Sequence, residues 1–576
     1  MADVKNTQNN TGAVSSSGVS RLALIRNVTR DCLMSMSDDD LHNPQYVEAT
    51  ILNAVQVEID VENSIREKYK WKPLHELIPS QIADIIYHTY SVVRVVTAGD
   101  INSDSSCDML AIYCEAGPNM GIYSTSLDIF NELARSYDYA LSIRGFEEMM
   151  NVLRGLAKKV LPCSDANLIA VNNGIFDYDT KTLLPFSPDM VFLSKSRVDY
   201  NDQATNVVIH NPEDGTDWDL ESWMNELNDD ADVVNTLWEV LGAIVRPNVS
   251  WGCAAWFYSE TGNNGKGTLC SLMRNLCGDG SYASIPLADM GKDFMLEPLT
   301  HSSAIIVDEN DVGTYIDKAA NLKAIITNDV ISINRKFKQP LAYVFHGFMV
   351  QCLNEMPRIK DKTDSFYRRQ LFIPFLKCFT GAERKYIKND YLKRKEVLEY
   401  ALYRVLNMNY YKLSVPQACK DALEEYKDFV DPVREFMKEH MPLFKWDLLP
   451  FRFMYDCYCA WYKAVAGNDR GQKSLVSFKK DVKVLVDKLY TNWEFVDVAQ
   501  RPADRMDEPE PLIDEYHLDD WMNARYRGSK DWEKRCLPNL KSTYRGLKRR
   551  QRQLGSDMDN DPAFLDDDGC DTEETV

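Results

Sequence analysis

The strongest constraint on this chain is the stretch from Trp251 to Thr268, WGCAAWFYSETGNNGKGT. Its apolar run Cys253–Tyr258 predicts a buried parallel strand, and Thr268–Leu276 predicts a helix with one apolar face. A glycine-rich loop, Glu260–Gly267, separates the two. Backbone N–H groups in such a loop and at the following helix N-terminus attract an anion, and Lys266 adds a positive charge. The stretch therefore predicts a phosphate-binding loop.

The loop departs from the usual pattern G-x-x-x-x-G-K-[ST] at two positions. Glu260 stands where a glycine is expected, and Gly267 stands where a magnesium-binding hydroxyl is expected. Either Thr268 substitutes for that hydroxyl or water fills its place. The Glu260 carboxylate is unfavourable beside phosphates unless it points away from them. Taken alone, the loop leaves open an ordinary glycine turn between a strand and a helix.

Two apolar strands further along the chain end in polar side chains. Ala304–Val307 is followed by Asp308 and Glu309, and Phe348–Leu353 is followed by Asn354. In an ATPase the first carboxylate holds Mg²⁺, the second activates the attacking water, and an amide orients that water. A buried strand with a charged exit and a structural turn residue are the alternatives.

A pair of arginines and a basic hairpin complete the set. Arg368 and Arg369 precede an apolar strand, where a guanidinium could stabilise phosphoryl charge across a subunit boundary or simply be solvated. Strands expected at Val330–Asn334 and Leu341–Phe345 flank a basic and aromatic tip. Such a tip suits nucleic acid, because cations meet phosphates and an aromatic ring packs on a sugar or base. An ordinary cationic hairpin is the alternative.

In this order, these pieces resemble the ATPase core of superfamily 3 helicases. The closest resemblance is to the phage/plasmid primase-helicase family and its poxvirus-type relatives, and it extends upstream to about Leu110 and downstream to about Leu406. The resemblance implies an AAA+-like core, ATP and Mg²⁺ as cofactors, single-stranded and forked DNA as ligands, and a homo-hexameric ring. A separate primase or other replication proteins are further implied partners, since no primase domain is recognised in this chain.

The resemblance also assigns roles to individual residues. The nucleotide-binding residues are Gly262, Asn263, Asn264, Gly265, Lys266, Gly267 and Thr268. The metal-binding residues are Thr268 and Asp308, and the catalytic residues are Asp308, Glu309, Asn354, Arg368 and Arg369, with either arginine as the finger. The DNA-binding residues are Arg335, Lys336, Phe337 and Lys338.

The predicted fold class is α/β, with an AAA+-like P-loop core, a mixed α+β N-terminal region and a mostly helical, winged-helix-compatible C-terminal domain. The predicted segments are a disordered leader (1–20), a helical region (21–106), a family-type domain (107–245), the ATPase core (246–410), a C-terminal DNA-binding module (411–552) and an acidic disordered tail (553–576).

Some local structure follows from residue patterns. Helices are expected over Gln81–Val95 and Leu127–Val160, and Leu168–Pro185 predicts three strands joined by turns. The aromatic stripe within Phe453–Val465 is expected in a core rather than on a base-stacking surface. The basic run Lys541–Arg552 is either a contact to a DNA backbone or a solvated helix face.

Composition excludes several classes of protein. The formal net charge of −21 argues against a protein that coats nucleic acid, although a local basic channel remains compatible with it. Fourteen cysteines without a Cys-x-x-Cys pair indicate thiols in a reducing compartment rather than disulfides or zinc. No apolar run reaches transmembrane length. We therefore expect no membrane partner and a place in the bacterial or host cytoplasm.

Three functions are compatible with these features. The first is an ATP-dependent DNA helicase acting in the replication of a phage, plasmid or mobile element. The second is an ATP-dependent DNA-binding switch or replication loader that does not unwind, which the departures at Glu260 and Gly267 and the acidic tail keep open. The third is a catalytically inactive scaffold.

Overall fold

The structure is a computed structural model that describes residues 20–102, 108–316, 318–336, 338–381, 384–469 and 471–550. The predicted acidic tail, and the predicted leader apart from Ser20, lie outside the described residues. By its internal contacts the chain divides after Tyr426 into two compact units, which are described one at a time. The segment boundaries drawn from the sequence stay predictions.

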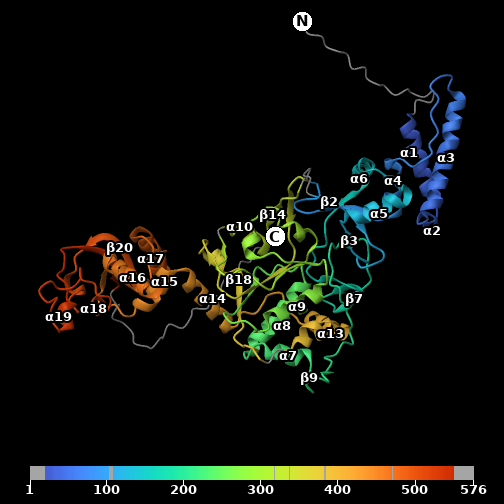
Figure 1. The fold of residues 1–576 in the computed structure, drawn as a ribbon. Coiled ribbons are helices and arrows are strands. Elements are labelled where there is room, and N and C mark those ends of the chain that lie inside the picture. Colours follow the sequence, from blue (N-terminus) through green and yellow to red (C-terminus); the bar gives the residue numbers. More distant parts are fainter. Residues whose placement is uncertain are drawn as a thin grey trace, which may run out of the picture. The chain divides into compact units, whose positions relative to one another are not determined.

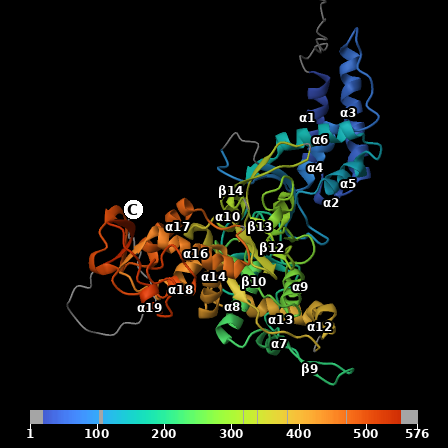
Figure 2. The ribbon, with the colours of Figure 1, turned by 60° about the vertical axis from the view of Figure 1, so that its left-hand side comes forward.

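The first unit begins with a helical hairpin. Helices α1 (Arg21–Ser35) and α3 (Pro44–Ile65) lie side by side in Figures 1 and 2, with the short α2 (Asp38–Leu41) between them in sequence. The Ser20 hydroxyl accepts a hydrogen bond from the Ala23 N–H and so caps α1. Residues of α3 spaced four apart are buried, as expected for one helix face, namely Val47, Ile51, Val55 and Ile59.

The helix expected over Gln81–Val95 is too long. Helix α4 (Pro79–Thr89) ends early, and strand β1 (Val92–Val96) follows it. Four of the five β1 residues are valines, whose branched side chains favour a strand. Strand β1 pairs antiparallel with β2 (Asp108–Tyr113), so the prediction of a helix over these residues was wrong.

The helical pattern expected up to Val160 also ends early, because the last residues join the same sheet. Helices α5 (Leu127–Tyr137) and α6 (Ile143–Leu156) are followed by strand β4 (Lys158–Val160), which pairs parallel with β1. With β3 (Tyr123–Ser124) the sheet order is β3-β2-β1-β4.

A connector leads to the core. Its three predicted strands are confirmed as an antiparallel meander of β5 (Leu168–Val171), β6 (Gly174–Asp177) and β7 (Thr182–Leu184). The elements that follow are β8 (Ile209–His210), β9 (Asp217–Trp218), α7 (Leu220–Glu226) and α8 (Ala231–Val245). Every residue of α8 from Thr236 to Val245 is buried, which makes it a central packing helix.

The core is a five-stranded sheet in the order β11-β12-β16-β10-β18, and every pairing in it is parallel. The strands are β10 (Ala254–Tyr258), β11 (Tyr282–Ala283), β12 (Ala304–Val307), β16 (Phe348–Leu353) and β18 (Gln370–Pro374). Alternate strand residues pack with α8, α9 (Lys266–Cys277) and α13 (Lys395–Leu406) in one apolar cluster. The expected α/β core is confirmed.

Shorter elements surround the sheet. They are the 3-10 helices η1 (Leu287–Asp289), η2 (Glu297–His301) and η3 (Tyr391–Lys393), strands β13 (Tyr315–Ile316), β14 (Val330–Ile333), β15 (Leu341–Val344) and β17 (Arg358–Ile359), and helices α10 (Ala320–Ile326), α11 (Asp364–Tyr367), α12 (Lys385–Asn389) and α14 (Gln417–Val430). Strands β14 and β15 pair antiparallel, so the predicted hairpin is confirmed.

The second unit combines helices with a small antiparallel sheet. Its elements are α15 (Pro432–His440), β19 (Leu448–Pro450), α16 (Phe451–Ala466), α17 (Leu475–Leu489), β20 (Trp493–Gln500), η4 (Ala503–Arg505), α18 (Leu512–Glu515), α19 (Trp532–Arg535) and β21 (Tyr544–Arg549). The sheet order is β19-β21-β20. The basic run Lys541–Arg552 was expected as a contact to a DNA backbone or as a solvated helix face. It contains the central strand of this sheet, β21, instead of a helix.

The aromatic stripe of α16 lies in the core of this unit, as the sequence predicted. Phe453, Tyr458 and Trp461 are all buried and pack with α15 and α17. Among the described residues of the whole chain, no helix combines the length and apolar character that crossing a membrane requires.

One carboxyl group in this core has an unusual setting. Glu510 is fully buried, and its Oε2 accepts a hydrogen bond of 2.9 Å from the Lys445 N–H. Its Oε1 has no hydrogen-bond partner in the described part of the chain. Burial raises the pKa of Glu510 from 4.5 to about 7, an effect that nearby backbone N–H groups only partly offset.

We predict that Glu510→Gln stabilises the second unit at alkaline pH. Because the folded-state pKa lies above the unfolded value, the stability that Glu510 contributes is complete below about pH 4.5 and is lost as pH rises through about 7. Calorimetry should therefore show a higher unfolding midpoint for the variant at pH 8.5 and a smaller gap at pH 5.5. Glu515→Gln, at an exposed position, is the control; an equal gap at both pH values for Glu510→Gln would contradict the prediction.

Candidate active site

The predicted loop connects β10 to α9 and buries its lysine. Lys266 is the first residue of α9 and is only 4% exposed. Its Nζ donates a hydrogen bond of 3.4 Å to the Ser259 carbonyl oxygen. Burial lowers the pKa of Lys266, because removing an ammonium group from water disfavours its charged form. The described residues offer this ammonium no carboxylate partner, so an anion would be stabilised beside it.

The backbone of the loop requires its glycine and asparagines. Gly265 has a φ of +86°, and a Cβ there would lie 2.6 Å from Leu227 Cδ2. Asn263 also has a positive φ, +55°, and its carbonyl oxygen accepts a hydrogen bond of 2.7 Å from the Phe379 N–H. The buried Asn264 side chain donates to the Thr261 carbonyl oxygen and accepts from the Lys266 N–H. These contacts hold the loop in one shape against α9.

A cavity of about 400 Å³ opens beside the first turn of α9. Its walls include the loop residues Asn263, Gly265 and Thr268. The other lining residues are apolar or polar, namely Trp223, Leu227, Phe379, Ile387, Lys385, Lys388, Asn389, and Arg384 with Glu226, to which Arg384 is ion-paired. The volume falls in the range of small-molecule sites, and apolar walls with a cationic end suit a nucleotide.

The two departures from the usual loop pattern have different structural outcomes. The Glu260 carboxylate accepts a hydrogen bond of 3.0 Å from the Tyr258 hydroxyl, and Glu260 does not line the cavity. Gly267 sits in α9, where a built Cβ would lie in ordinary contact with the Lys388 Nζ, and its carbonyl oxygen accepts from the Ser271 hydroxyl. Thr268 provides the hydroxyl that lines the cavity.

The predicted acidic strand ends at the same edge of the sheet as the loop. Because the strands are parallel, β10, β12 and β16 end at one edge, with β16 lying between the other two. Asp308 and Glu309 follow β12, and Asn354 follows β16. All three are exposed, so they are accessible to a ligand at this edge.

Arg274, which sequence reasoning missed, binds Asp308. Its Nη1 and Nη2 donate hydrogen bonds of 3.0 and 2.8 Å to the two carboxylate oxygens. These bonds are the main cause of the lowered pKa of Asp308. Arg274 lies eight residues after Lys266 on α9, a helical spacing that places both on neighbouring parts of one face and could have pointed to it.

A buried amide also escaped the sequence analysis. Asn310 donates to the Gln351 Oε1 at 2.9 Å and to the Cys352 carbonyl oxygen at 3.0 Å, and it accepts from the Leu287 N–H at 2.9 Å. These bonds fix the exit of β12 against β16. They set the positions of the residues that follow both strands, and no sequence spacing signalled them.

Arg368 and Arg369, the two candidates for the arginine finger, differ in exposure and in hydrogen bonding. Arg369 is half-buried, and its Nη1 donates to the Ser365 backbone oxygen and, at 2.8 Å, to the Ser365 hydroxyl. Arg368 is exposed at the C-terminal end of α11, with no ion pair among the described residues. Arg368 is therefore the one whose guanidinium is available to another molecule.

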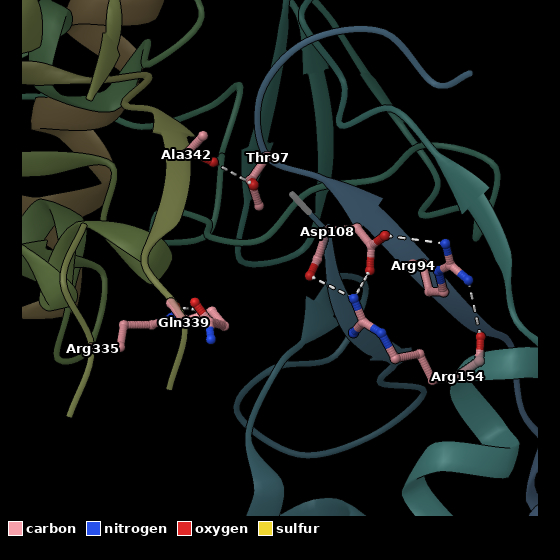
Figure 3. A network of polar contacts seen from close by, with 7 residues as sticks. All are labelled: Arg94, Thr97, Asp108, Arg154, Arg335, Gln339 and Ala342. Atoms are coloured by element: carbon pink, nitrogen blue, oxygen red, sulfur yellow. Dashed lines mark hydrogen bonds and ion pairs between the residues drawn. The ribbon is translucent and has the colours of Figure 1, made fainter. Parts of the chain in front are cut away.

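The hairpin carries its predicted cations at an exposed tip. Lys336 and Lys338 are exposed, while the Arg335 Nη2 donates to the Gln339 carbonyl oxygen at 3.2 Å. Phe337 lies outside the described residues. Strand β15 of the hairpin is bound to the residue after β1, where the Thr97 hydroxyl donates to the Ala342 carbonyl oxygen at 2.7 Å (Figure 3).

Figure 3 also shows the ion pairs that bind β2 to β1 and α6. The buried Asp108 at the start of β2 receives Arg94 Nη2 at 3.1 Å and a second guanidinium, from Arg154 of α6. A carboxylate between two guanidiniums is fully satisfied, so this cluster is explained as a structural clamp within the β3-β2-β1-β4 sheet.

The fit of Mg²⁺ to these side chains is incomplete. Thr268 offers a hydroxyl, but the Asp308 carboxylate is occupied by Arg274 and Gly267 offers no ligand. Within the described residues, no group of three His, Cys, Asp or Glu side chains could hold a metal by itself. A magnesium ion here would depend on a nucleotide's own phosphate oxygens for ligands.

Two protein-family models match parts of the chain. Residues 127–229 match a family described as D5 N terminal like, and residues 257–369 match a family of unknown function (DUF5906). A search of curated proteins gives no match. The D5 N terminal like match supports the resemblance of this chain to phage-type primase-helicases.

Several solved structures are similar at low identity. The A form apo structure of the NrS-1 C terminal region is 12% identical, with 82% of this chain and 100% of that chain covered and a TM-score of 0.38. An apo structure of the NrS-1 C terminal region (305–718) is 12% identical, with 74% and 98% covered and a TM-score of 0.40. A crystal structure of JCV helicase with a bound acetamide compound is 16% identical, with 36% of this chain and 59% of that chain covered and a TM-score of 0.22.

We predict that Gly265→Ala and Gly267→Ala affect stability in opposite directions. Alanine at 265 needs a positive φ and meets Leu227, so about 1–3 kcal/mol of unfolding free energy should be lost. Alanine at 267 has room and improves helix propensity, so stability should hold or rise by up to about 1 kcal/mol. Urea unfolding measures both, and an equal loss in the two variants would show that the described loop conformation is wrong.

Proposed function

We propose that this protein is an ATP-dependent DNA helicase of the superfamily 3 type that acts in the replication of a phage, plasmid or mobile element. The observation that carries the proposal is the buried Lys266 ammonium at the start of α9, beside a nucleotide-sized cavity and at the same sheet edge as Asp308, Glu309 and Asn354. The D5 N terminal like match upstream of the loop supports it.

In this proposal each side chain acts on a different part of bound ATP. Lys266 and the N–H groups at the start of α9 bind the phosphates, and the apolar cavity wall receives the base. Glu309 accepts a proton from the attacking water, and Asn354 orients that water. A magnesium ion bound with the nucleotide would neutralise developing phosphate charge, with Thr268 the hydroxyl nearest to serve it.

Arg368 completes the site from a neighbouring subunit. Its guanidinium is exposed, whereas Arg369 is bonded to Ser365, so the proposal resolves the open choice in favour of Arg368. A ring of subunits, a hexamer in the resembling family, would bring each Arg368 to the next nucleotide. Charge on the transferring phosphoryl group would then be stabilised only in the assembly.

DNA contacts are proposed at two places, one in each unit. In the first unit the exposed Lys336 and Lys338 of the hairpin would bind phosphates in the ring channel. In the second unit, three helices with a sheet in the order β19-β21-β20 are compatible with a winged helix. Its strand β21 carries Arg545, Lys548 and Arg549.

One observation favours a second candidate function. Because Arg274 neutralises Asp308, the site can attract a nucleotide without the free carboxylate that hydrolysis usually needs for its metal. An ATP-dependent DNA-binding switch or loader would use such a site. The two functions differ in whether bound ATP is hydrolysed and whether hydrolysis separates strands.

The first test measures ATP hydrolysis with and without single-stranded DNA. We expect DNA-stimulated turnover by the wild type and a loss of at least about 100-fold in Lys266→Ala, because the main phosphate-binding cation is removed. A forked-duplex assay then tests unwinding. Nucleotide binding without turnover in the wild type would refute the helicase and favour the switch.

The second test examines the arginine pair. Arg368→Ala should lower turnover by about 10³-fold or more, whereas Arg369→Ala should change it by less than about fivefold. If the finger acts across a subunit boundary, mixing Arg368→Ala with Lys266→Ala should restore part of the activity, because some sites then contain one intact residue from each chain. No recovery on mixing, with mixed oligomers present, would contradict an arginine supplied across the boundary.

A further inference from the structure

Lys388 occupies the space that the missing loop side chain leaves. It lies on α12, and its Nζ would be 3.8 Å from a Cβ built on Gly267. Apart from its chain neighbours and the backbone of its own helix, no other atom of the described residues lies within 4 Å of that Cβ. A lysine ammonium thus stands beside the position where the usual pattern carries a hydroxyl for the metal.

Lys388 lines two cavities beside α9. Lys388 lines the nucleotide-sized cavity together with Thr268. It also lines a second cavity of about 380 Å³ together with Arg274. Lys388 therefore lies between the phosphate-binding loop and the Arg274–Asp308 pair.

The charges nearby leave the Lys388 ammonium available. Lys388 is exposed, and no ion pair joins it to a carboxylate of the described residues. After the dominant hydrogen bonds from Arg274, its charge further lowers the pKa of Asp308, which places it close enough for the two to interact. Arg274 and Lys388 are thus two cations that act on the Asp308 carboxylate.

We infer that Lys388 binds the nucleotide's phosphates and supplies part of the positive charge that a hydroxyl-bound metal ion would otherwise provide. A point-charge ammonium on a flexible stem can reach phosphate oxygens from a neighbouring helix. Nucleotide binding by this chain therefore depends less on Mg²⁺ than binding by a loop with a hydroxyl at position 267 would. This inference rests on the proposed nucleotide site and adds one residue and one property to it.

The experiment measures the affinity of N-methylanthraniloyl-ATP for the full chain by fluorescence, in EDTA and in excess Mg²⁺. The wild type should bind with less than about a tenfold difference between the two conditions. Lys388→Met should lose about tenfold or more in EDTA and clearly less in Mg²⁺, since a charge-assisted contact is removed. Lys385→Met is the matched control. Lys385 lies on the same short helix and lines the same cavity, but its ammonium does not lie beside Gly267.

A second pair of variants tests the exchange of ligand directly. Gly267→Ser adds the hydroxyl without a steric clash, and Gly267→Ser combined with Lys388→Met should make binding strongly dependent on Mg²⁺. Equal losses for Lys388→Met and Lys385→Met in EDTA would overturn the role of Lys388 while leaving the site intact. No binding by the wild type in either condition, with Lys266→Ala indistinguishable from it, would overturn the nucleotide site and the inference together.

Discussion

The parallel pairing of β10 with β16 is the interaction on which the rest of the site depends. It brings the end of the strand before the loop next to the strand that carries Asn354, and β12 joins on the far side of β16. Residues far apart in sequence thus meet at one sheet edge. The buried amide of Asn310 then fixes β12 to β16 by hydrogen bonds to Gln351 and the Cys352 carbonyl oxygen. Without that register, the residues that follow β12 and β16 would not share a sheet edge with the loop.

The electrostatics of the edge follow from burial and pairing. Lys266 loses water without gaining a carboxylate, so its ammonium favours an anion. Asp308 gains a bidentate guanidinium and holds its charge more strongly as a result. The site is consequently more cationic than the whole chain, whose net charge is −21, and this local balance is what suits a polyphosphate. Gly267 fits the same arrangement. It has no side chain to bind a metal ion, and the Lys388 ammonium lies beside it.

The sequence predicted much of this core because its signals are local. Short buried strands followed by polar residues, and a glycine loop before a helix, appear directly in the pattern of residues, and the hairpin flanking Arg335–Lys338 has the strands expected of it. The predictions failed where partners decided the outcome. Val92–Val96 forms a strand because β2 and β4 pair with it, and the basic run around Arg545 forms a strand because β19 and β20 flank it. Strand β2 is the next element after β1, but β4, β19 and β20 are separated from their partners by several other elements.

The sequence by itself determined the type of each element around the loop and the chemical character of the candidate residues, because periodicity, glycine placement and charge are properties of a few neighbouring residues. Only the tertiary structure decided which side chains meet. It paired Arg274 with Asp308, held Arg369 on Ser365 while leaving Arg368 exposed, and placed Lys388 beside Gly267. The physical reason is that these contacts depend on strand order and helix packing, which bring together residues that are distant along the chain, and no spacing in the sequence encodes the distance between two side chains.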